Sequence, residues 1–316
     1  MNELPHTEVS TSFMPTTTQL RERACAICGT SAEQRWMEPR VDFSALDDFA
    51  FASRKLPEYM HFALALCSNC DLVFADQVPD SDWFKACYRE ANFDAVNESR
   101  YAAKTYGLAL QRIVPMFTNM RSALDIGAGD GSFVAELIKA GFDQVIGVEP
   151  SIEPVSRALP SVKHLLRNDF FKPEDFQENS FDLITCFQTL EHLEDPLALC
   201  KSAHALLKSG GILLTVAHNF RAPLARLLGE RSPIYDIEHL QLFSPQSLSR
   251  LYMRAGFSHV EVQSLRNAYP LHYWLKLLPL PKSAKRVLLA QLKTHRLGQW
   301  LIAAKVGNMI AVGIKR

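Results

Sequence analysis

Residues 123–133, with the sequence ALDIGAGDGSF, constrain the fold of this 316-residue chain more than any other stretch. An apolar run that ends on an acid predicts a strand, and the glycines after it predict a bend where the backbone can approach a ligand closely. The following segment, FVAELIKAG, has the pattern of a helix that ends at Gly141. A strand, a glycine turn and a helix in this order are typical of a nucleotide-type binding turn.

Strand-like and helical patterns alternate through the rest of the chain. We predict further strands at QVIGVEP, FDLITCFQT, GILLTVAH, HVEVQSL and NMIAVGIKR, and a weaker one at VKHLLRNDF. Such alternation predicts an α/β fold, a doubly wound, Rossmann-like parallel sheet with helices on both faces. Residues 266–306, between the last two strands, have a helical pattern, and we predict an insertion that packs over the sheet edge or the active site.

Composition divides the chain into four parts. Residues 1–23 are polar and rich in Thr, Ser and Pro, which predicts a flexible tail. Residues 24–79 are rich in cysteine and aromatic residues and form a separate module. Residues 80–119 have a helical pattern and link this module to the α/β domain at 120–316.

Charge and hydropathy exclude several classes of protein. The 34 basic residues balance the 34 acidic ones, which argues against a broad nucleic-acid-binding surface. The N-terminus lacks the basic start and apolar core of a secretory signal, and no apolar run reaches the length of a membrane-spanning helix. Cysteines without an export signal favour a reducing, cytoplasmic location.

Acids lie at the tips of three predicted strands. Asp125 precedes the glycine turn, Glu149 ends the next strand, and Asp169 with Phe170 follows the one after that. A carboxylate at the second tip can accept hydrogen bonds from both ribose hydroxyls. Asp125, and Asp130 within the turn, would repel a pyrophosphate but suit a ligand with a cationic amino acid and a sulfonium.

The stretches LDIGAGDGSF, VIGVEPS, NDFF, FDLITCFQTLEHLEDP and LLKSGGILLTVAHN together resemble the class I S-adenosylmethionine-dependent methyltransferases. The resemblance implies this cofactor and a binding role for residues at the strand tips. It places the methionine portion beside Asp125 and the turn, the ribose at Glu149, the adenine at Asp169 and Phe170, and the sulfonium over Gln188. The implied cofactor set is Asp125, Gly127, Ala128, Gly129, Gly131, Glu149, Pro150, Asp169, Phe170 and Gln188.

Two C-x-x-C pairs lie in the N-terminal module, at Cys25 and Cys28 and at Cys67 and Cys70. Four thiolates on two knuckles can surround one Zn²⁺ tetrahedrally and leave no position open, so we predict a structural zinc in a zinc-ribbon-like module. A redox role for the pairs is the alternative, but neither follows a thioredoxin-like pattern. Cys87, Cys186 and Cys200 lie on apolar faces and are predicted to be core residues.

A cysteine module, an aromatic-rich linker and a methyltransferase core resemble the zinc-binding methyltransferases that act on sugars, including the nucleotide-sugar C-methyltransferases. This resemblance covers residues 24–265 and implies a sugar or nucleotide-sugar acceptor. In that group an E-H step before an aromatic-Ser-Pro helix start supplies the base, and Glu238-His239 matches it. The usual aromatic pair is here Leu242-Phe243, so both C- and O-methylation stay open.

Methyl transfer also requires removal of a proton from the acceptor, for which histidine is the usual base. His239, in the long segment from His218 to Phe243, is one candidate, and His192, after the fourth strand, is another. Glu238 is adjacent to His239, so a pairing between them needs a bend in the backbone. Tyr235 is a third candidate, and the long segment is predicted to act as a lid.

Two other functions stay open: a methyltransferase of RNA or protein, and a scaffold that binds the cofactor without catalysis. Neutral charge disfavours RNA, and the intact acid and glycine pattern disfavours a scaffold. Basic residues of the insertion predict either a solvated helix face or a weak contact with anionic lipid headgroups, namely Lys282, Lys285, Arg286, Lys293 and Arg296.

Overall fold

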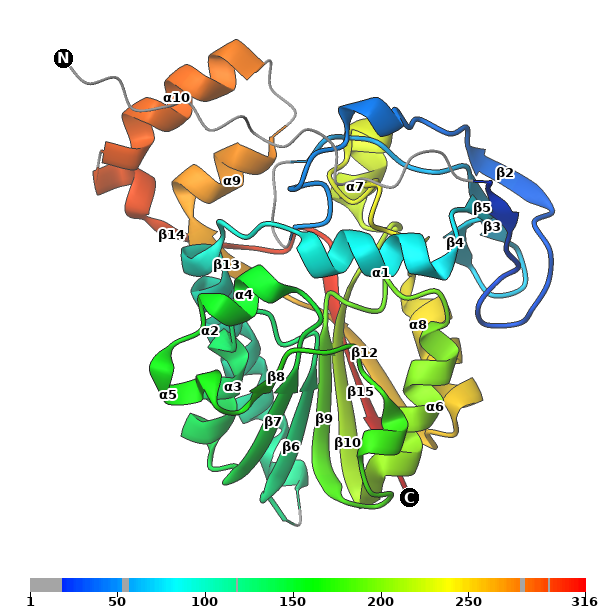
Figure 1. The fold of residues 1–316 in the computed structure, drawn as a ribbon, viewed down its shortest axis with the longest axis vertical. Helices are drawn as coiled ribbons and strands as arrows, with labels where there is room; N and C mark the ends of the chain where they lie inside the picture. Colours follow the sequence, from blue (N-terminus) through cyan, green and yellow to red (C-terminus); the bar gives the residue numbers. More distant parts are fainter. Residues whose placement is uncertain (1–18, 53–56, 118, 279–281, 295) are drawn as a thin grey trace.

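The computed structural model describes residues 19–52, 57–117, 119–278, 282–294 and 296–316, and its centre is a seven-stranded sheet (Figure 1). The strand order is β12-β15-β10-β9-β6-β7-β8. The first five strands along the chain are parallel, and the last strand runs antiparallel to both of its neighbours. The bounds are β6 Ser122–Ile126, β7 Gln144–Val148, β8 Leu166–Arg167, β9 Phe181–Phe187, β10 Leu207–His218, β12 His259–Ser264 and β15 Asn308–Ile314. This confirms the predicted mostly parallel, Rossmann-like sheet.

Helices cover both faces of this sheet. The core on one face includes residues of α2 (Val96–Ile113) and α3 (Ser132–Ala140), and the core on the other includes residues of α6 (Pro196–Leu206) and α8 (Pro245–Ala255). Helix α8 begins as its Ser-Pro start predicts, because the Ser244 hydroxyl accepts the Ser247 amide and Pro245 has the fixed φ of a first helical residue.

The weak strand predicted at VKHLLRNDF is mostly wrong. Its first residues belong to α5 (Pro160–Lys163), which follows the short α4 (Ile152–Ser156), and only the two residues of β8 pair with β7. Pro160 explains the difference, since a proline at the first position favours a helix and cannot donate to a strand ladder.

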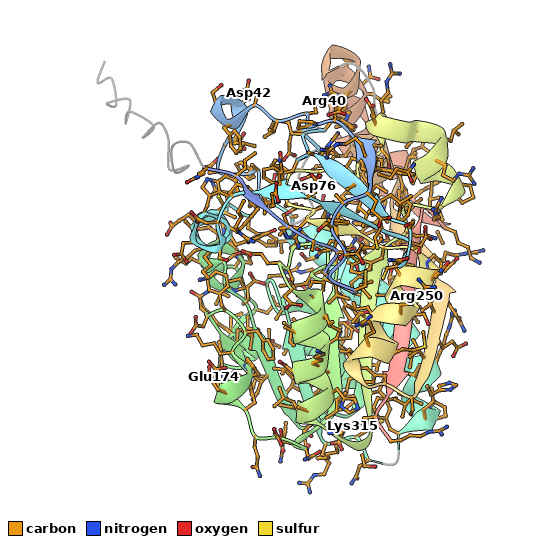
Figure 2. All side chains as sticks on the ribbon, turned by 90° about the vertical axis from the view of Figure 1, so that its right-hand side faces the viewer. Arg40, Asp42, Asp76, Glu174, Arg250 and Lys315 are labelled. Carbon is orange, nitrogen blue, oxygen red and sulfur yellow. The ribbon has the colours of Figure 1, made fainter. Side chains whose placement is uncertain are left out.

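The N-terminal module forms a four-stranded sheet of order β11-β4-β3-β2. Strands β2 (Gln34–Met37), β3 (Leu64–Cys67) and β4 (Leu72–Ala75) come from the module itself. Strand β11 (Gln241–Leu242) comes from the segment after β10, so the α/β domain supplies an edge strand to the module. Asp76 and Arg40 of the module lie at one end of the molecule and Lys315 at the other (Figure 2).

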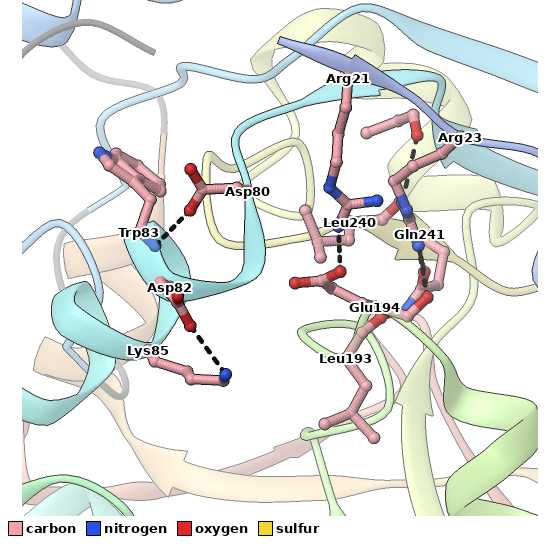
Figure 3. A network of polar contacts seen from close by, with 11 residues as sticks. Arg21, Arg23, Asp80, Asp82, Trp83, Lys85, Leu193, Glu194, Leu240 and Gln241 are labelled. Atoms are coloured by element: carbon pink, nitrogen blue, oxygen red, sulfur yellow. Dashed lines mark hydrogen bonds and ion pairs between the residues drawn. The ribbon is translucent and has the colours of Figure 1, made fainter. Parts of the chain in front are cut away.

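Arg23 connects the module to the loops around it (Figure 3). Its guanidinium donates to the carbonyls of Ala75, Leu240 and Glu194 and to the Gln241 side chain. Burial lowers the Arg23 pKa to about 10, although Glu194 acts in the opposite direction. Residues 21–23 were predicted to be part of the tail, but β1 (Arg21–Glu22) pairs with β5 (Gln77–Val78), and the Arg23 amide donates to the Asp76 carbonyl. Residues 1–18 of the predicted tail lie outside the described residues.

The predicted linker and insertion both contain helices near the carboxyl ends of the strands (Figure 1). The linker consists of α1 (Ser81–Glu90) and α2. The insertion contains α9 (Leu271–Leu277) and α10 (Lys282–Thr294), and its base is a strand pair that the sequence pattern did not predict, β13 (Asn267–Pro270) with β14 (Leu301–Ala304). Among the described helices, none is long and apolar enough to cross a bilayer.

Candidate active site

One cavity of about 810 Å³ lies where the parallel strands end, and most of the predicted site residues line it. Its walls come from the β6–α3 turn, the ends of β7, β9 and β10, helices α1 and α2, the insertion, and the segment that contains α7 (Pro223–Leu228). The predicted lid is therefore partly helical and forms one wall of the cavity. A volume of this size accommodates a nucleoside cofactor together with a second small molecule.

The glycine turn has the backbone geometry that the sequence predicts. Gly127, Gly129 and Gly131 have φ values of 77°, 54° and 71°. A Cβ on Gly127 would lie 2.3 Å from the Thr189 hydroxyl, so this position accepts no side chain without a shift. Gly131 does not line the cavity; it precedes α3 and packs against Val162 and Leu166.

The two strand-tip acids next to this turn are buried. Asp125 accepts a hydrogen bond of 2.6 Å from the Thr185 hydroxyl, and burial raises its pKa to about 7. Glu149 accepts the amides of Gly129 and Ser151 at 2.8 and 2.9 Å, and burial raises its pKa as well. Both carboxyls therefore favour a cationic neighbour that stabilises the ionised form.

The third strand tip is only partly as predicted. Pro150 and Phe170 line the cavity, but Asp169 does not. Its carboxylate accepts the Phe170 amide and pairs with Lys172 at 2.7 Å, because the short β8 ends before the chain reaches the cavity. Asn168 was missed: its side-chain amide donates to three carbonyls, those of Glu149, Pro150 and Ser151, and so ties two strand tips together.

Gln188 lies within a hydrogen-bonded row of side chains that line the cavity. It has a φ of 51°, accepts the Tyr106 hydroxyl at 2.9 Å, and lies 3.3 Å from His218 Nε2. His218 Nδ1 contacts the Asn308 side chain at 2.9 Å. Burial, followed by the neighbouring His239, lowers the His218 pKa to about 3, so this imidazole is neutral. Tyr106 and Asn308 carried no motif that sequence analysis could recognise.

The two candidate histidines and Glu238 lie together in the same cavity. The Glu238 carboxylate is 3.4 Å from His192 Nδ1, so the acid pairs across the fold with His192. His239 Nδ1 instead contacts the Ile234 carbonyl at 2.7 Å, and its ring packs 5.1 Å from the His192 ring. Tyr88 of α1, which sequence analysis missed, contacts His192 Nδ1 at 2.9 Å.

Tyr235, the third candidate for the base, does not line the cavity. Its side chain is buried against the N-terminal module, where its hydroxyl accepts the Trp36 indole N–H at 3.3 Å. Burial raises its pKa, which disfavours loss of its proton. Packing in this interface explains why the tyrosine points away from the predicted substrate.

The four cysteines of the two C-x-x-C pairs meet in the N-terminal module, with their thiols all within 4.8 Å of one another. The Sγ atoms of Cys28 and Cys67 are 3.5 Å apart, close to the roughly 3.8 Å expected between two sulfurs on a tetrahedral zinc. The Gly29 and Asp71 amides donate to the carbonyls of Cys25 and Cys67, which forms the two knuckles. Cys87, Cys186 and Cys200 are buried elsewhere.

Charge in the cavity is one-sided. Among the described residues that line it, Lys85 is the only lysine or arginine, and it donates to Asp82. Acids are far more numerous in the lining: Asp125, Asp130, Glu149, Glu194, Asp195, Asp236 and Glu238. The cavity therefore favours a cationic or neutral ligand and has little to offer a pyrophosphate.

The chain is also similar to proteins of known families. The family described as "Methyltransferase domain" matches residues 98–262, a match that begins inside α2 and ends in β12. Similar curated proteins include the ubiquinone biosynthesis O-methyltransferase of Actinobacillus pleuropneumoniae serotype 7, 33% identical over 121 residues, which cover 34% of this chain and 51% of that protein. The corresponding Coxiella burnetii enzyme is 33% identical over 157 residues, 46% of this chain and 67% of its own.

The chain thus spans about half the length of the Actinobacillus relatives that it matches. Among solved structures, it is similar to an S-adenosylmethionine-dependent methyltransferase from Archaeoglobus fulgidus, with a TM-score of 0.46 and 19% identity. That likeness covers 67% of this chain and 94% of the other.

Proposed function

Because the chain belongs to the methyltransferase domain family, we propose that it transfers the methyl group of S-adenosylmethionine to a small-molecule acceptor in this cavity. One observation carries the proposal: the acid-flanked glycine turn and a carboxylate–imidazole pair line the same cavity. The first suits the cofactor, and the second suits removal of a proton from the acceptor.

The cofactor would lie along the strand tips. Asp125 and Glu149 are buried carboxyls with raised pKa values, and a nearby positive charge would favour their ionised forms. Phe170 and Pro150, which line the cavity, would offer apolar surface to the adenine, and Gln188 would lie beneath the sulfonium. Asp169 has no part in this proposal, because its carboxylate pairs with Lys172 outside the cavity.

Proton removal would fall to the cluster of His192, Glu238 and His239. His239 Nδ1 contacts a backbone carbonyl and so carries the proton, which makes Nε2 the basic nitrogen. In the His192 pair, the Glu238 carboxylate stabilises the imidazolium that forms when the ring accepts a proton. Holding the acceptor in line with the methyl carbon supplies most of the remaining rate.

An acceptor with a hydroxyl group and an apolar body fits the cavity best. The lining contains acids, one lysine, and many aromatic and aliphatic side chains, including Phe84, Tyr273 and Trp274. The similar curated proteins are O-methyltransferases, which favours oxygen as the methylated atom. A sugar acceptor stays a prediction, and a nucleotide sugar would find no cluster of lysine or arginine for its phosphates in the described lining.

The cysteine cluster would hold a structural zinc. Four thiols within 4.8 Å of one another suit Zn²⁺, and the knuckle of Cys67 and Cys70 joins β3 to β4 in the small sheet that also contains β11 of the α/β domain. The metal would stabilise the wall that carries Tyr88 without taking part in the chemistry. Metal analysis of the purified protein tests this, with a Cys25→Ser/Cys70→Ser variant as the comparison; equal zinc in both would refute it.

The proposed activity is tested by following S-adenosylhomocysteine production with hydroxylated aromatic and aliphatic acceptors and with sugars. Glu238→Gln should bind S-adenosylmethionine as the wild type does but lose turnover by about 100-fold, in the range of general acid–base catalysis. Calorimetric titration with the cofactor separates the two effects. A wild-type protein that binds no S-adenosylmethionine would refute the proposal.

A further inference from the structure

Two imidazoles and a carboxylate converge at one side of the cavity. A ring nitrogen of His192, a ring nitrogen of His239 and an oxygen of Glu238 all lie within 4.8 Å of one another. His239 and Glu238 are buried, and His192 is half-buried. Two histidines and one carboxylate form a ligand set that binds divalent first-row transition metals in preference to Mg²⁺ or Ca²⁺, which favour oxygen ligands.

Contacts around these three side chains resemble the outer shell of a metal site. A metal-binding histidine commonly donates its other ring N–H to a backbone carbonyl, as His239 Nδ1 does to Ile234 at 2.7 Å. His192 Nδ1 contacts the Tyr88 hydroxyl at 2.9 Å and lies 3.4 Å from the Glu238 carboxylate, so a tyrosine on α1 holds this ring beside the acid of the cluster. The Asp236 carboxylate accepts the Glu238 amide and so fixes the backbone that carries the acid.

Local charge also favours a cation at this position. Glu238 and Asp236 are 8% and 3% exposed and line the same part of the cavity. Within the described lining, the only lysine is Lys85, on α1, and no arginine is present. A divalent ion would neutralise the negative charge that these two buried carboxylates bring together.

We propose that His192, Glu238 and His239 bind one divalent transition-metal ion, separate from the ion of the cysteine cluster. Ligands on a metal at about 2.1 Å lie roughly 3 to 3.5 Å apart. The Glu238 carboxylate and His192 Nδ1 are already 3.4 Å apart, and the ligand atoms of all three side chains lie within 4.8 Å of one another, so binding needs only small side-chain movements. The ion would keep open positions, since the protein supplies three ligands.

Metal binding changes how the cluster can act. With an ion present, His192, Glu238 and His239 would act as its ligands, and the metal would supply Lewis-acid chemistry that lowers the pKa of a hydroxyl group bound to it. Without an ion, an imidazole accepts the proton of the hydroxyl group. Binding itself does not depend on the proposed methyl transfer, so it can be tested without any acceptor.

The experiment titrates Co²⁺ into the full-length protein after chelation and records the visible absorption. Cobalt on four thiolates gives intense sulfur-to-metal charge-transfer bands, whereas cobalt on nitrogen and oxygen gives only weak ligand-field bands. We expect the wild type to bind two equivalents, with both signals. Glu238→Gln and His239→Ala should each lose the nitrogen–oxygen signal and one equivalent, and keep the thiolate signal.

Two controls distinguish loss of the proposed site from general damage to the protein. His259→Ala changes an exposed histidine on β12 and should bind two equivalents. The thiolate bands of each variant report that the module is folded, and Cys25→Ser/Cys70→Ser should lose those bands only. A wild type without the nitrogen–oxygen signal, or a Glu238→Gln protein that keeps it, would overturn the proposal.

Discussion

At the scale of single residues, the site depends on the buried carboxyl groups of Asp125 and Glu149, whose pKa values burial raises. Asp125 has a pKa of about 7, well above its ordinary value, because burial disfavours its charge. A group whose folded pKa is raised contributes stability below its unfolded pKa, and that contribution disappears as the pH rises through about 7. Ionisation of Asp125 at neutral pH therefore lowers the free energy of unfolding of the unliganded protein, and a cationic cofactor beside the carboxylate would offset this loss.

Asp125→Asn tests this loss. The amide cannot ionise, so the free energy of unfolding of the variant should depend less on pH between 5 and 8 than that of the wild type, and should exceed it at pH 8. Affinity for S-adenosylmethionine should fall about tenfold or more at pH 8. Urea denaturation at both pH values and calorimetry measure the two effects. Parallel pH curves for both proteins would contradict the burial argument.

Gly127 and Gly129 form a matched pair for testing the turn. Both have positive φ, but only at Gly127 would a Cβ meet Thr189, whereas at Gly129 it would meet nothing within 4 Å. Gly129→Ala should cost about 1 kcal/mol of backbone strain. Gly127→Ala should cost more and weaken cofactor binding further, because the turn must shift. Thermal unfolding and calorimetry compare them; equal effects would show that strain alone matters.

At the scale of elements, the two-residue strand β11 connects the α/β domain to the sheet of the N-terminal module. Gln241 in this strand is fully buried, and its side-chain amide donates to the carbonyls of Leu190 and Leu193, while its oxygen accepts from Arg23. Backbone pairing with Phe74 continues the module sheet. Gln241 therefore donates from its side chain to the loop after β9 and pairs through its backbone with the edge of the module sheet.

Gln241→Leu should lower the free energy of unfolding by about 2 kcal/mol or more, because the buried carbonyls of Leu190 and Leu193 lose a donor and the Arg23 guanidinium loses one of its acceptors. Gln246→Leu, at an exposed position of α8, is the control and should change stability little. Urea denaturation gives both values. A loss no larger than that of the control would show that β11 does not couple the two sheets.

Sequence patterns predicted what local chemistry determines. The strand–helix alternation, the glycine turn and the capped start of α8 follow from periodicity and turn residues, and each is present. Strands β11, β13 and β14 could not be predicted, since residues far apart in the chain make their pairs. Tyr88 and Tyr106 were missed for the same reason, because only tertiary packing brings them to the cavity.

The sequence likewise did not predict which histidine pairs with Glu238. Glu238 is adjacent to His239, yet its carboxylate lies beside His192, while His239 Nδ1 contacts the Ile234 carbonyl. Asp169 illustrates the opposite case. It matched a strand-tip pattern, but the strand proved to be two residues long and the carboxylate pairs with Lys172.

At the scale of the whole molecule, the module and the α/β domain share a sheet edge, a buried arginine and the wall of one cavity. These shared contacts imply that the two parts unfold together rather than separately.

The contact of the basic insertion with lipids stays a prediction. The side chains of Lys282, Arg286, Lys293 and Arg296 lie outside the described residues.

Removal of metal tests the coupling between the module and the α/β domain. If zinc stabilises the cysteine cluster, a strong chelator should lower the melting temperature of the entire chain and leave a single transition, because β11 and Arg23 transmit the loss. The Cys25→Ser/Cys70→Ser protein, which lacks the site, should melt low with or without chelator. Differential scanning calorimetry records both. Two separate transitions, with the larger one unaffected, would contradict the coupling.

Strand β11 is synthesised after the other strands of the module sheet, which affects how the module folds during translation. Strands β2, β3 and β4 leave the ribosome long before Gln241 and Leu242 exist, so the nascent module must wait with the edge of β4 unpaired. An uncovered edge strand is a template for pairing with other chains. Early capture of a metal ion by the cysteines, or binding by a chaperone, would protect that edge until the downstream segment arrives.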